Sequence, residues 1–415
     1  VKREKGKPVV FITGDSTVKN EDKDENGMWG WGSQAYTVFD QDKITCVNCA
    51  KAGRSTRTFL NEGRWDKVYN SLQPGDYVLI QFGHNDIGPI DNQKQRGTIA
   101  CAKDTSHVYK LADSGKYEVV YSFGWYLKKF IQDVREKGAT PILVSLTPRN
   151  EWPGGKIERR NDSYGKWYRE VVKETGVELV DVHNISADFL DRIGREKAKA
   201  YYNHDHTHTS LTGAKMNAKS VAKGLMRNDS PLAKYLISST TIVEDMSKRD
   251  PKNNEPFYYS AELPDGNYKV TVVFGSKKKA GKTVVRAENR RLMVDEVATK
   301  KGEFKTVEFT VNKRTTFISD LKYVKIKDRE KNYPTWDDFL TLEFTGEAPA
   351  VKELRIERDT VATQIFLCGN STVTDQPSEP YASWGQMAPV WFGPDVVIAN
   401  HAESGLATSS FIAQG

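Results

Sequence analysis

One short stretch sets the architecture of the first half of the chain: Val9-Val10-Phe11-Ile12-Thr13-Gly14-Asp15-Ser16-Thr17. Its apolar half predicts a strand covered on both faces, as strands of parallel sheets are. The small and polar residues that follow predict a tight turn at the carboxyl end of this strand. In open α/β sheets the chemistry takes place at that end. The Ser16 hydroxyl is therefore the first candidate for a functional group.

Strand and helix signals alternate from the start of the chain to about residue 236. Tyr77–Phe82 and Pro141–Leu146 are nearly continuous apolar runs, which predict further buried strands. Between them, Trp125–Val134 carries apolar residues at helical spacing, and Gly138 follows as a C-cap. Repeated strand–helix–strand order predicts an α/β domain over residues 1–236, with a parallel sheet flanked by helices.

The pattern changes after residue 236. From Phe257 to Ile356 the sequence shows polar–apolar alternation and turns, and no helical spacing. Examples are Asn267–Phe274, Thr306–Val311 and Leu340–Phe344. Short strands at this spacing predict a β-sandwich, which we assign to residues 237–360.

The composition fits a globular protein of two or three domains. The 415 residues are 38% hydrophobic and 28% charged, and no apolar run is long enough to span a membrane. The formal net charge of +6 favours an acidic partner. Lysines and arginines are scattered, so we expect neither a nucleic-acid partner nor membrane insertion. The chain opens at Val1 without a signal-like segment, and we expect a processed or engineered N-terminus.

The four cysteines do not form a framework. Cys46 and Cys49 form a CxxC motif, but zinc needs a second ligand pair at suitable spacing, which the sequence lacks. A thioredoxin-like motif opens a helix, whereas the residues around Cys46 have strand character. We expect buried thiols, or an isolated disulfide between one of them and Cys101.

Four separated segments of the first domain supply complementary chemistry. Ser16 offers a nucleophile, and Asp205 and His208 offer the carboxylate–imidazole pair that activates such a hydroxyl. Gly53 offers an exposed backbone N–H, and Asn85 offers a side-chain amide. An acyl-transfer intermediate carries an oxyanion, which needs such donors in place beforehand. These residues fill every role in acyl transfer.

Each element also has a purely structural interpretation. A serine after a strand is often only a turn residue or a helix N-cap, and Asn85 and Asp86 could only brace a turn. We expect Asp15 to brace the serine turn. The cluster His204–His208 could ligate a metal, but it does not define a coordination geometry. We therefore predict no metal and no organic cofactor.

These blocks resemble the SGNH (GDSL-type) hydrolases, a family named for Ser, Gly, Asn and His in separated blocks. Here they are Ser16, Gly53, Asn85 and His208, with Asp205 completing the triad. The supporting stretches are Phe11–Val18, Ala52–Ser55, Phe82–Asp86 and Asp205–Ser210. The chain is most similar to the rhamnogalacturonan acetylesterase branch. The resemblance extends to about Leu236 and implies a flavodoxin-like parallel sheet flanked by helices.

The resemblance implies two-step acyl transfer. Ser16 attacks an ester carbonyl while His208 takes its proton, and Asp205 orients His208. The backbone N–H groups of Ser16 and Gly53 and the amide of Asn85 stabilise the oxyanion. The branch implies removal of acetyl groups from pectic polysaccharide by a secreted or periplasmic enzyme.

Substrate contacts are less constrained by the sequence. Aromatic side chains can form sugar platforms or lie in the core, and arginines can face galacturonate carboxylates. The candidates are Trp31, Arg54, His84, Arg149 and His206, with Trp29, Tyr36, Arg57 and Trp152 as further options. The insertion from about Asp91 to Tyr117 is expected to form one rim of the cleft.

Other functions stay open. The same chemistry could act on another acetylated glycan such as xylan, or on a lipid ester. For a lipid ester we would expect an apolar tunnel that holds the acyl chain. A non-catalytic polysaccharide-binding protein is a further alternative, against which the intact blocks argue. The sandwich resembles the galactose-binding-like domains attached to carbohydrate esterases, as a sugar-binding module or a spacer.

The serine turn returns near the end of the sequence, as an internal repeat. The matching pairs are Gly369–Val373 with Gly14–Val18, Trp384-Gly385 with Trp31-Gly32, and Asn400–Gly405 with Asn48–Gly53. We therefore assign residues 361–415 to an incomplete second SGNH domain. No later segment matches the Asn85 or Asp205–His208 blocks, so we expect Ser371 to be inert. We also expect the parent protein to continue into a second full esterase domain.

Overall fold

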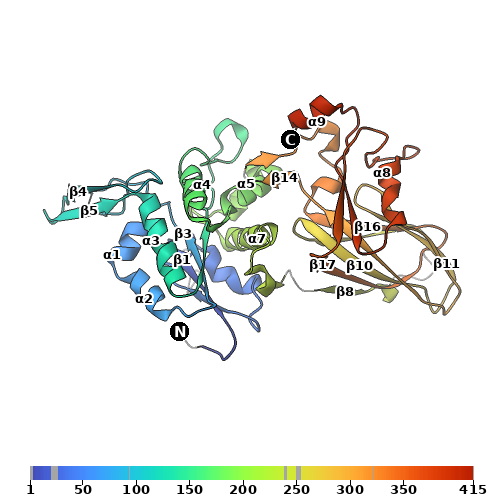
Figure 1. Ribbon diagram of the computed structural model, residues 1–415, viewed down its shortest axis with the longest axis horizontal. Helices are drawn as coiled ribbons and strands as arrows, with labels where there is room; N and C mark the ends of the chain where they lie inside the picture. Colours follow the sequence, from blue (N-terminus) through green and yellow to red (C-terminus); the bar gives the residue numbers. More distant parts are fainter. Residues whose placement is uncertain are drawn as a thin grey trace. The chain divides into compact units, whose positions relative to one another are not determined.

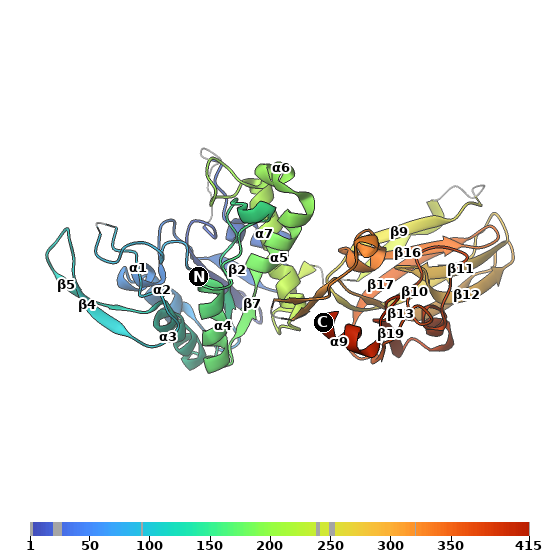
Figure 2. The same cartoon turned by 90° about the horizontal axis from the view of Figure 1, so that it is seen from above.

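The computed structural model describes residues 3–19, 27–92, 94–237, 241–248, 254–319 and 321–414. The chain folds into two compact units, Val1–Ser238 and Ser239–Gly415 (Figures 1 and 2). The predicted segments 237–360 and 361–415 thus lie together in the second unit. No helix among the described residues is long and apolar enough to cross a lipid bilayer.

The described part of the first unit is built on a parallel sheet of order β2-β1-β3-β6-β7. Its strands are β1 (Val9–Gly14), β2 (Thr45–Asn48), β3 (Tyr77–Gln81), β6 (Thr140–Val144) and β7 (Glu178–Val180). Its α-helices are α1 (Thr56–Asn61), α2 (Arg64–Ser71), α3 (Phe123–Glu136), α4 (Tyr164–Thr175), α5 (Val182–Ile193), α6 (Arg195–Ala198) and α7 (Leu211–Arg227). Its 3₁₀ helices are η1 (Trp31–Thr37), η2 (Pro153–Gly155), η3 (Lys199–Tyr201) and η4 (Ala233–Tyr235). The predicted parallel sheet flanked by helices is confirmed.

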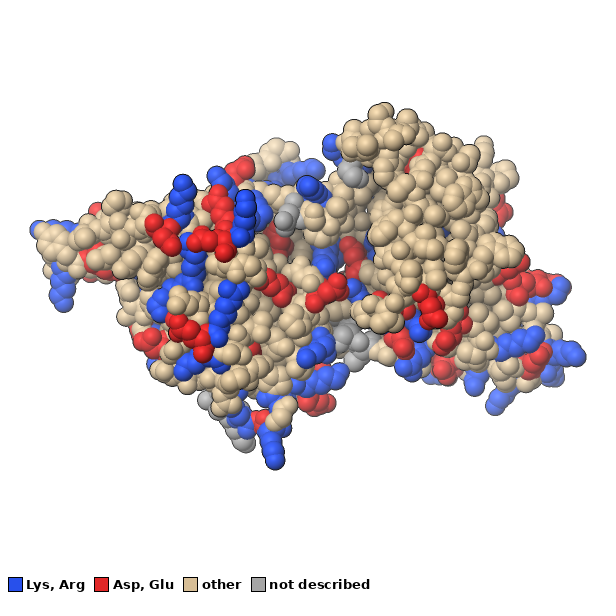
Figure 3. Space-filling model, viewed as in Figure 1, with Lys and Arg blue, Asp and Glu red and all other residues tan. Residues whose placement is uncertain are grey.

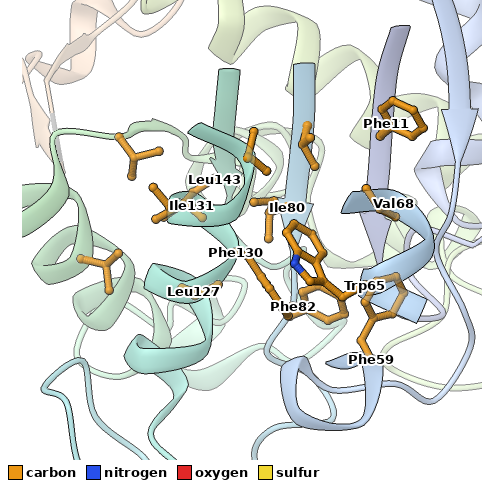
Figure 4. Packing of buried hydrophobic residues seen from close by; sticks show 14 of the residues in the cluster. Phe11, Phe59, Trp65, Val68, Ile80, Phe82, Leu127, Phe130, Ile131 and Leu143 are labelled. Atoms are coloured by element: carbon orange, nitrogen blue, oxygen red, sulfur yellow. The ribbon is translucent and has the colours of Figure 1, made fainter. Parts of the chain in front are cut away.

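The strands are buried on both faces, as their apolar runs predict. In β1, Val9 and Phe11 belong to one apolar cluster, whereas Val10 and Ile12 belong to the other. The first cluster packs against helices α1 to α4 (Figure 4). The second packs against η1 and α7. The period-two alternation of side chains thus feeds two separate cores from one strand.

The insertion between β3 and α3 forms an antiparallel hairpin of β4 (Ser106–Lys110) and β5 (Tyr117–Tyr121). It projects away from the main sheet in both ribbon views (Figures 1 and 2). An ion pair between the buried Arg57 and the partly exposed Glu118 ties the hairpin to α1. The same guanidinium donates to the carbonyls of Ile90 and Gly97 at 2.8 and 3.1 Å.

The second unit contains the predicted β-sandwich. Its antiparallel sheets have the orders β13-β10-β17-β8 and β12-β11-β16-β9 in the described residues. The strands are β8 (Ile242–Asp245), β9 (Phe257–Glu262), β10 (Gly266–Phe274), β11 (Gly281–Ala287), β12 (Arg291–Thr299), β13 (Lys305–Lys313), β16 (Phe339–Thr345) and β17 (Val351–Asp359). Alternate residues of both sheets meet in one apolar core, which includes Val270, Val272, Leu342 and Leu354.

Residues 363–414, called here the C-terminal copy, repeat the opening of the first unit. Its elements are β18 (Thr363–Leu367), α8 (Trp384–Met387), η9 (Ala388–Trp391), β19 (Val396–Asn400) and α9 (Thr408–Gln414). β18 and β19 are parallel, with Leu367 opposite Asn400. Ile12 of β1 lies opposite Asn48 of β2 in the same way. The register of the first pair is therefore repeated in the second.

The same hydrogen bonds brace both serine turns. Asp15 Oδ1 accepts from the backbone N–H and the hydroxyl of Thr17, both at 2.8 Å. Asn370 Oδ1 accepts from the same groups of Thr372 at 3.2 and 3.0 Å. Asparagine can replace aspartate here because only an acceptor oxygen is needed.

A second correspondence lies at the end of the paired strands. Asn48 and Asn400 each donate from Nδ2 to the carbonyl of the valine after the serine turn, at 2.7 and 2.6 Å. A Cβ at Gly32 or Gly385 would lie within 3.1 Å of both of these atoms, so both positions require glycine. These shared contacts support the proposal that residues 361–415 are a second copy of the opening segment.

The two copies differ in how far their matching side chains are buried. The side chains of Phe11 and Trp31 are 1% and 0% exposed, whereas Phe366 and Trp384 are 61% and 58% exposed. In the first unit β3 pairs with β1, but among the described residues β18 pairs with β19 alone. Figure 3 shows few charged side chains around α8 and α9.

The C-terminal copy packs against the sandwich through buried polar contacts. Arg291 and Asp375 form an ion pair at 3.0 Å, with both side chains almost fully buried. Asn289 donates to the Asp375 carbonyl at 2.7 Å. A short strand–helix fragment cannot bury a core of its own, so these contacts explain its place in the second unit.

The two tryptophans provide a test of this difference in burial. Trp31→Phe removes the donor that satisfies the buried Gln81 Oε1 and leaves a void, so the unfolding free energy should fall by about 2–4 kcal/mol. Trp384→Phe, at the exposed counterpart, should change it by less than about 0.5 kcal/mol. Urea denaturation followed by circular dichroism measures both, and equal losses would contradict the assignment of burial.

Candidate active site

The functional candidates meet where the strand order of the first sheet reverses. From β1 the sheet continues to β2 on one side and to β3 on the other. Ser16 follows β1, Gly53 follows β2, and Asn85 follows β3. Parallel strands present their carboxyl ends at one edge, and a reversal of order opens a crevice there. The topology thus brings three of the predicted blocks together.

The structure joins the predicted triad by direct hydrogen bonds. Ser16 Oγ lies 2.9 Å from His208 Nε2, although 192 positions separate the two residues. His208 Nδ1 lies 2.6 Å from Asp205 Oδ2. A hydroxyl, an imidazole and a carboxylate in this order form the arrangement that activates a serine for attack.

A closed loop holds the His208 side of this arrangement. Tyr202 and Thr209 form an antiparallel bridge, and the Asn203 N–H donates to the His208 carbonyl at 2.9 Å. Directly afterwards, Ser210 caps α7 by accepting from the Gly213 N–H. The loop is therefore fixed at both ends by regular structure.

The charge state of Asp205 follows from its contacts. Desolvation raises the pKa of Asp205, but hydrogen bonds from the His208 and Thr207 N–H groups and from the His208 imidazole outweigh it and lower the pKa to about 2. The carboxylate therefore accepts a hydrogen bond from the protonated Nδ1 of His208. This leaves Nε2 as an acceptor for the Ser16 hydroxyl, which is the tautomer that a general base needs.

A chain of buried hydrogen bonds supports the serine turn from below. Trp31 Nε1 donates to Gln81 Oε1, Gln81 Nε2 donates to Thr17 Oγ1, and Thr17 Oγ1 donates to Asp15 Oδ1, each at 2.8 Å. Burial raises the pKa of Asp15 to about 6. The prediction that Trp31 contacts substrate is wrong, because this indole is fully buried in the core. A sequence signal for Gln81 existed, since it is a polar residue in an otherwise apolar strand.

The predicted oxyanion donors are available. Gly53 has a φ of +75°, and the Asn85 Nδ2 group donates to the Arg54 carbonyl at 3.2 Å, which joins the two loops. Among the hydrogen bonds of the described residues, none uses the backbone N–H of Ser16 or Gly53. These N–H groups can therefore donate to a substrate oxygen.

Asp86 connects the asparagine block to the start of α1. Its Oδ1 accepts from the backbone N–H of Thr56 at 3.2 Å and from the Thr56 hydroxyl at 2.5 Å. Burial raises the pKa of Asp86 to about 7. Asp86 thus has a structural role, as the sequence allowed, and its bonds to Thr56 link the Asn85 loop to the start of α1, which follows the Gly53 loop.

Comparison with known proteins agrees with this geometry. Residues 12–216 match the GDSL-like lipase/acylhydrolase family. The chain is 30% identical over 217 residues to the rhamnogalacturonan acetylesterase of Emericella nidulans, which covers 52% of this chain and 84% of that protein. The chain belongs to the GDSL-like lipase/acylhydrolase family. It is an esterase, as the residue blocks predict.

Further relatives cover the same half of the esterase. The rhamnogalacturonan acetylesterase RhgT of Bacillus subtilis is 32% identical over 248 residues, covering 56% of this chain and 96% of that protein. Among solved structures, the acetylxylan esterase Axe2 of Geobacillus stearothermophilus shares 19% identity, with a TM-score of 0.37. That match covers 53% of this chain and 94% of the Axe2 chain.

The arginines predicted to meet substrate differ in availability. Arg57 is fully buried and paired with Glu118, so the option that it binds substrate is wrong. Arg54 forms an ion pair with Glu62 at 3.0 Å, which neutralises its charge. The half-buried Arg149 guanidinium makes no hydrogen bond among those of the described residues, and its Nε is a buried donor without an acceptor. Arg149 is therefore the member of this set that can meet an anion.

The two histidines predicted to meet substrate lie in different surroundings. His84 Nε2 lies 3.3 Å from Thr147 Oγ1, and its Nδ1 is buried without a partner. Burial, and then the charges of Arg160 and Arg149, lower the pKa of His84 well below 6.5, so its ring is neutral. His206 is half exposed, with Nδ1 3.6 Å from Glu151 Oε1.

The sequence did not single out a hollow beside the asparagine block. It has a volume of about 280 Å³ and is lined by Asp86, Ile87, Thr98, Ala100, Arg160, Ser163, Tyr164 and Trp167. The Trp167 ring is partly exposed there, whereas Tyr164 is buried and the Arg160 guanidinium pairs with Glu158 at 3.2 Å. Arg160 and Trp167 carry no motif, so only their position marks them.

The cysteines of the esterase are free thiols. Burial raises the pKa of Cys46 and of Cys49 to about 11, which keeps both protonated at neutral pH. Neither thiol is therefore activated as a thiolate, and the optional disulfide to Cys101 is absent. Within the described ranges, no three His, Cys, Asp or Glu residues are grouped so that they could hold a metal ion.

The buried Asp86 predicts a pH-dependent stability. Its folded-state pKa of about 7 exceeds the ordinary 3.8, so between these values the folded state holds more protons than the unfolded state. The unfolding free energy should therefore fall as the pH rises through this window, and Asp15 contributes with the same sign.

Asp86→Asn keeps an acceptor for Thr56 but cannot titrate. The unfolding free energy of the variant minus that of the wild type should rise by about 2 kcal/mol or more between pH 4.5 and 7.5. Urea denaturation at several pH values measures this difference. A difference that does not change with pH would show that Asp86 titrates normally.

Proposed function

We propose that this esterase removes acetyl groups from the pectic polysaccharide rhamnogalacturonan through an acyl-enzyme on Ser16. The observation that carries the proposal is the hydrogen-bonded series Ser16–His208–Asp205. Support for the substrate comes from relatives of 30% and 32% identity that are named rhamnogalacturonan acetylesterases.

In the first half of the reaction, Ser16 Oγ attacks the carbonyl carbon of the acetyl ester. Its proton passes to His208 Nε2, and the Asp205 carboxylate stabilises the resulting imidazolium. The tetrahedral intermediate then collapses, the bond to the sugar oxygen breaks, and His208 returns the proton to that oxygen. The sugar hydroxyl leaves, and the acetyl group remains as an ester of Ser16.

The second half repeats these steps with water as the nucleophile. His208 Nε2 takes a proton from the water, whose oxygen attacks the acetyl carbonyl. The second intermediate collapses, the bond to Ser16 Oγ breaks, and His208 returns its proton to that oxygen. Acetic acid is released and ionises to acetate. In both halves the backbone N–H groups of Ser16 and Gly53 and the Asn85 amide donate to the oxyanion.

Two features of the cleft suit an acidic polysaccharide. Arg149 offers a half-buried guanidinium, which makes no hydrogen bond among those of the described residues, for the carboxylate of a uronic acid. The hollow lined by Arg160, Tyr164 and Trp167 offers the partly exposed ring of Trp167 for a sugar. Because such a substrate lies outside the cell, we also propose that the protein is secreted or periplasmic. Sugar binding by the sandwich remains a prediction.

The internal repeat offers a matched pair of serine variants. Ser16→Ala should reduce the release of p-nitrophenol from p-nitrophenyl acetate by about 10⁴-fold or more, because no nucleophile is left. Ser371→Ala removes the same hydroxyl from the C-terminal copy, where no triad contact exists among the described residues, and should leave turnover unchanged. Turnover that persists in Ser16→Ala would reject the acyl-enzyme mechanism.

The substrate class is tested by acetate release from acetylated rhamnogalacturonan, acetylated xylan and p-nitrophenyl acetate. We expect the highest kcat/KM on rhamnogalacturonan. Arg149→Gln should raise the KM for this acidic polymer by about 10-fold and leave p-nitrophenyl acetate hydrolysis unchanged, because only the polymer carries carboxylates. A higher kcat/KM on xylan than on rhamnogalacturonan would overturn the substrate assignment. So would an equal rise in the KM for xylan in Arg149→Gln.

A further inference from the structure

Arg96, from the insertion that follows the asparagine block, lies against both loops of the oxyanion hole. Its Nη1 donates to Asn85 Oδ1 at 3.2 Å. Its Nη2 lies 2.5 Å from the position that a Cβ on Gly53 would occupy. One guanidinium therefore contacts the Asn85 amide and covers the open side of Gly53. Glycine is required at position 53 for this contact as well as for its positive φ.

The chemistry of the guanidinium determines how the Asn85 amide is turned. Arginine only donates hydrogen bonds, so the Asn85 oxygen must face Arg96. The Nδ2 group then faces the other way, where it donates to the Arg54 carbonyl at 3.2 Å. Among the bonds of the described residues this group makes that one hydrogen bond. Its second N–H remains for the oxygen of the substrate.

Arg96 differs from its neighbouring arginines in forming no ion pair with a carboxylate of the described residues. Arg54 pairs with Glu62, and Arg57 pairs with Glu118. Among the described residues, no carboxylate forms an ion pair with Arg96, so a structural ion pair does not account for it. Its positive charge lies beside the site where negative charge develops in the transition state.

The backbone next to Arg96 is held in place. A Cβ on the buried Gly97 would lie 2.1 Å from the Gly88 carbonyl oxygen, so the chain segments touch there. Thr98 donates from its N–H to the Asp86 carbonyl at 3.1 Å. The Arg96 side chain thus extends from an anchored segment and can hold a neighbouring group in one orientation.

We propose that Arg96 is a positioning residue of this esterase, which turns the Asn85 amide so that an N–H faces the substrate oxygen. This inference rests on the proposed roles of Ser16, Gly53 and Asn85. It predicts an effect on the transition state, because the oxyanion forms only there. Binding of the ground-state ester should change little.

The first test compares two cations of one loop. Arg96→Met removes the donor while keeping a side chain of similar length, and should lower kcat on p-nitrophenyl acetate by about 10- to 100-fold, with KM within about twofold. Arg96→Lys, which keeps a donor and the charge, should retain more activity than Arg96→Met. Lys94→Met removes an exposed charge two positions away and should leave both constants unchanged. Circular dichroism and Tm verify that each variant is folded.

A double-mutant cycle separates positioning from a general effect of charge. In an Asn85→Ala background the group that Arg96 orients is missing. Arg96→Met should therefore lower kcat by less than about threefold in that background. Additive losses, or a raised KM with an unchanged kcat, would overturn the role assigned to Arg96. Turnover that survives Ser16→Ala would instead refute the proposed function, so the two failures are distinguishable.

Discussion

Parallel pairing of β1 with β3 is the constraint on which the site depends. It places the turns after the two strands at one edge of the sheet, where Ser16 and the Asn85 block face a common space. The pairing is held by side chains as well as by the backbone, because Gln81 of β3 links Trp31 to Thr17 in the serine turn. The nucleophile is thus supported by the core beneath it, and a rigid element fixes its position.

The C-terminal copy shows what this constraint adds to a local sequence. The turn around Asn370 has the same hydrogen bonds as the turn around Asp15, since they depend only on residues close in the chain. The surroundings differ, because β18 has β19 as its neighbour among the described residues and nothing in the position of β3. Phe366 and Trp384 are consequently exposed where Phe11 and Trp31 are buried. Hydrogen bonds between residues close in the chain are enough to form the turn. A functional site around it also needs the neighbouring strand.

Electrostatics divide the carboxylates of the first unit by role. Asp205 receives enough hydrogen bonds to stay charged, which suits a partner of His208. Asp15 and Asp86 are buried, and their pKa values rise to about 6 and about 7. They brace loops, but they lower the unfolding free energy as the pH approaches neutrality. Arg96 and Arg149 add positive charges that form no ion pair with a carboxylate among the described residues. Positive charge in the cleft can therefore stabilise the negative charge of the transition state and that of an acidic substrate.

The sequence by itself determined the fold class and the triad, because buried strands, turns and reactive residue types leave local patterns. Ser16, Asp205 and His208 were identified in this way, as were the Gly53 and Asn85 loops. Only the tertiary structure decided which polar and aromatic side chains face the cleft. Trp31 lies in the core, and Arg57 forms an ion pair with Glu118. Arg96 contacts Asn85 from an insertion that carries no motif. Burial and pairing arise from contacts between distant segments, so no local pattern encodes them.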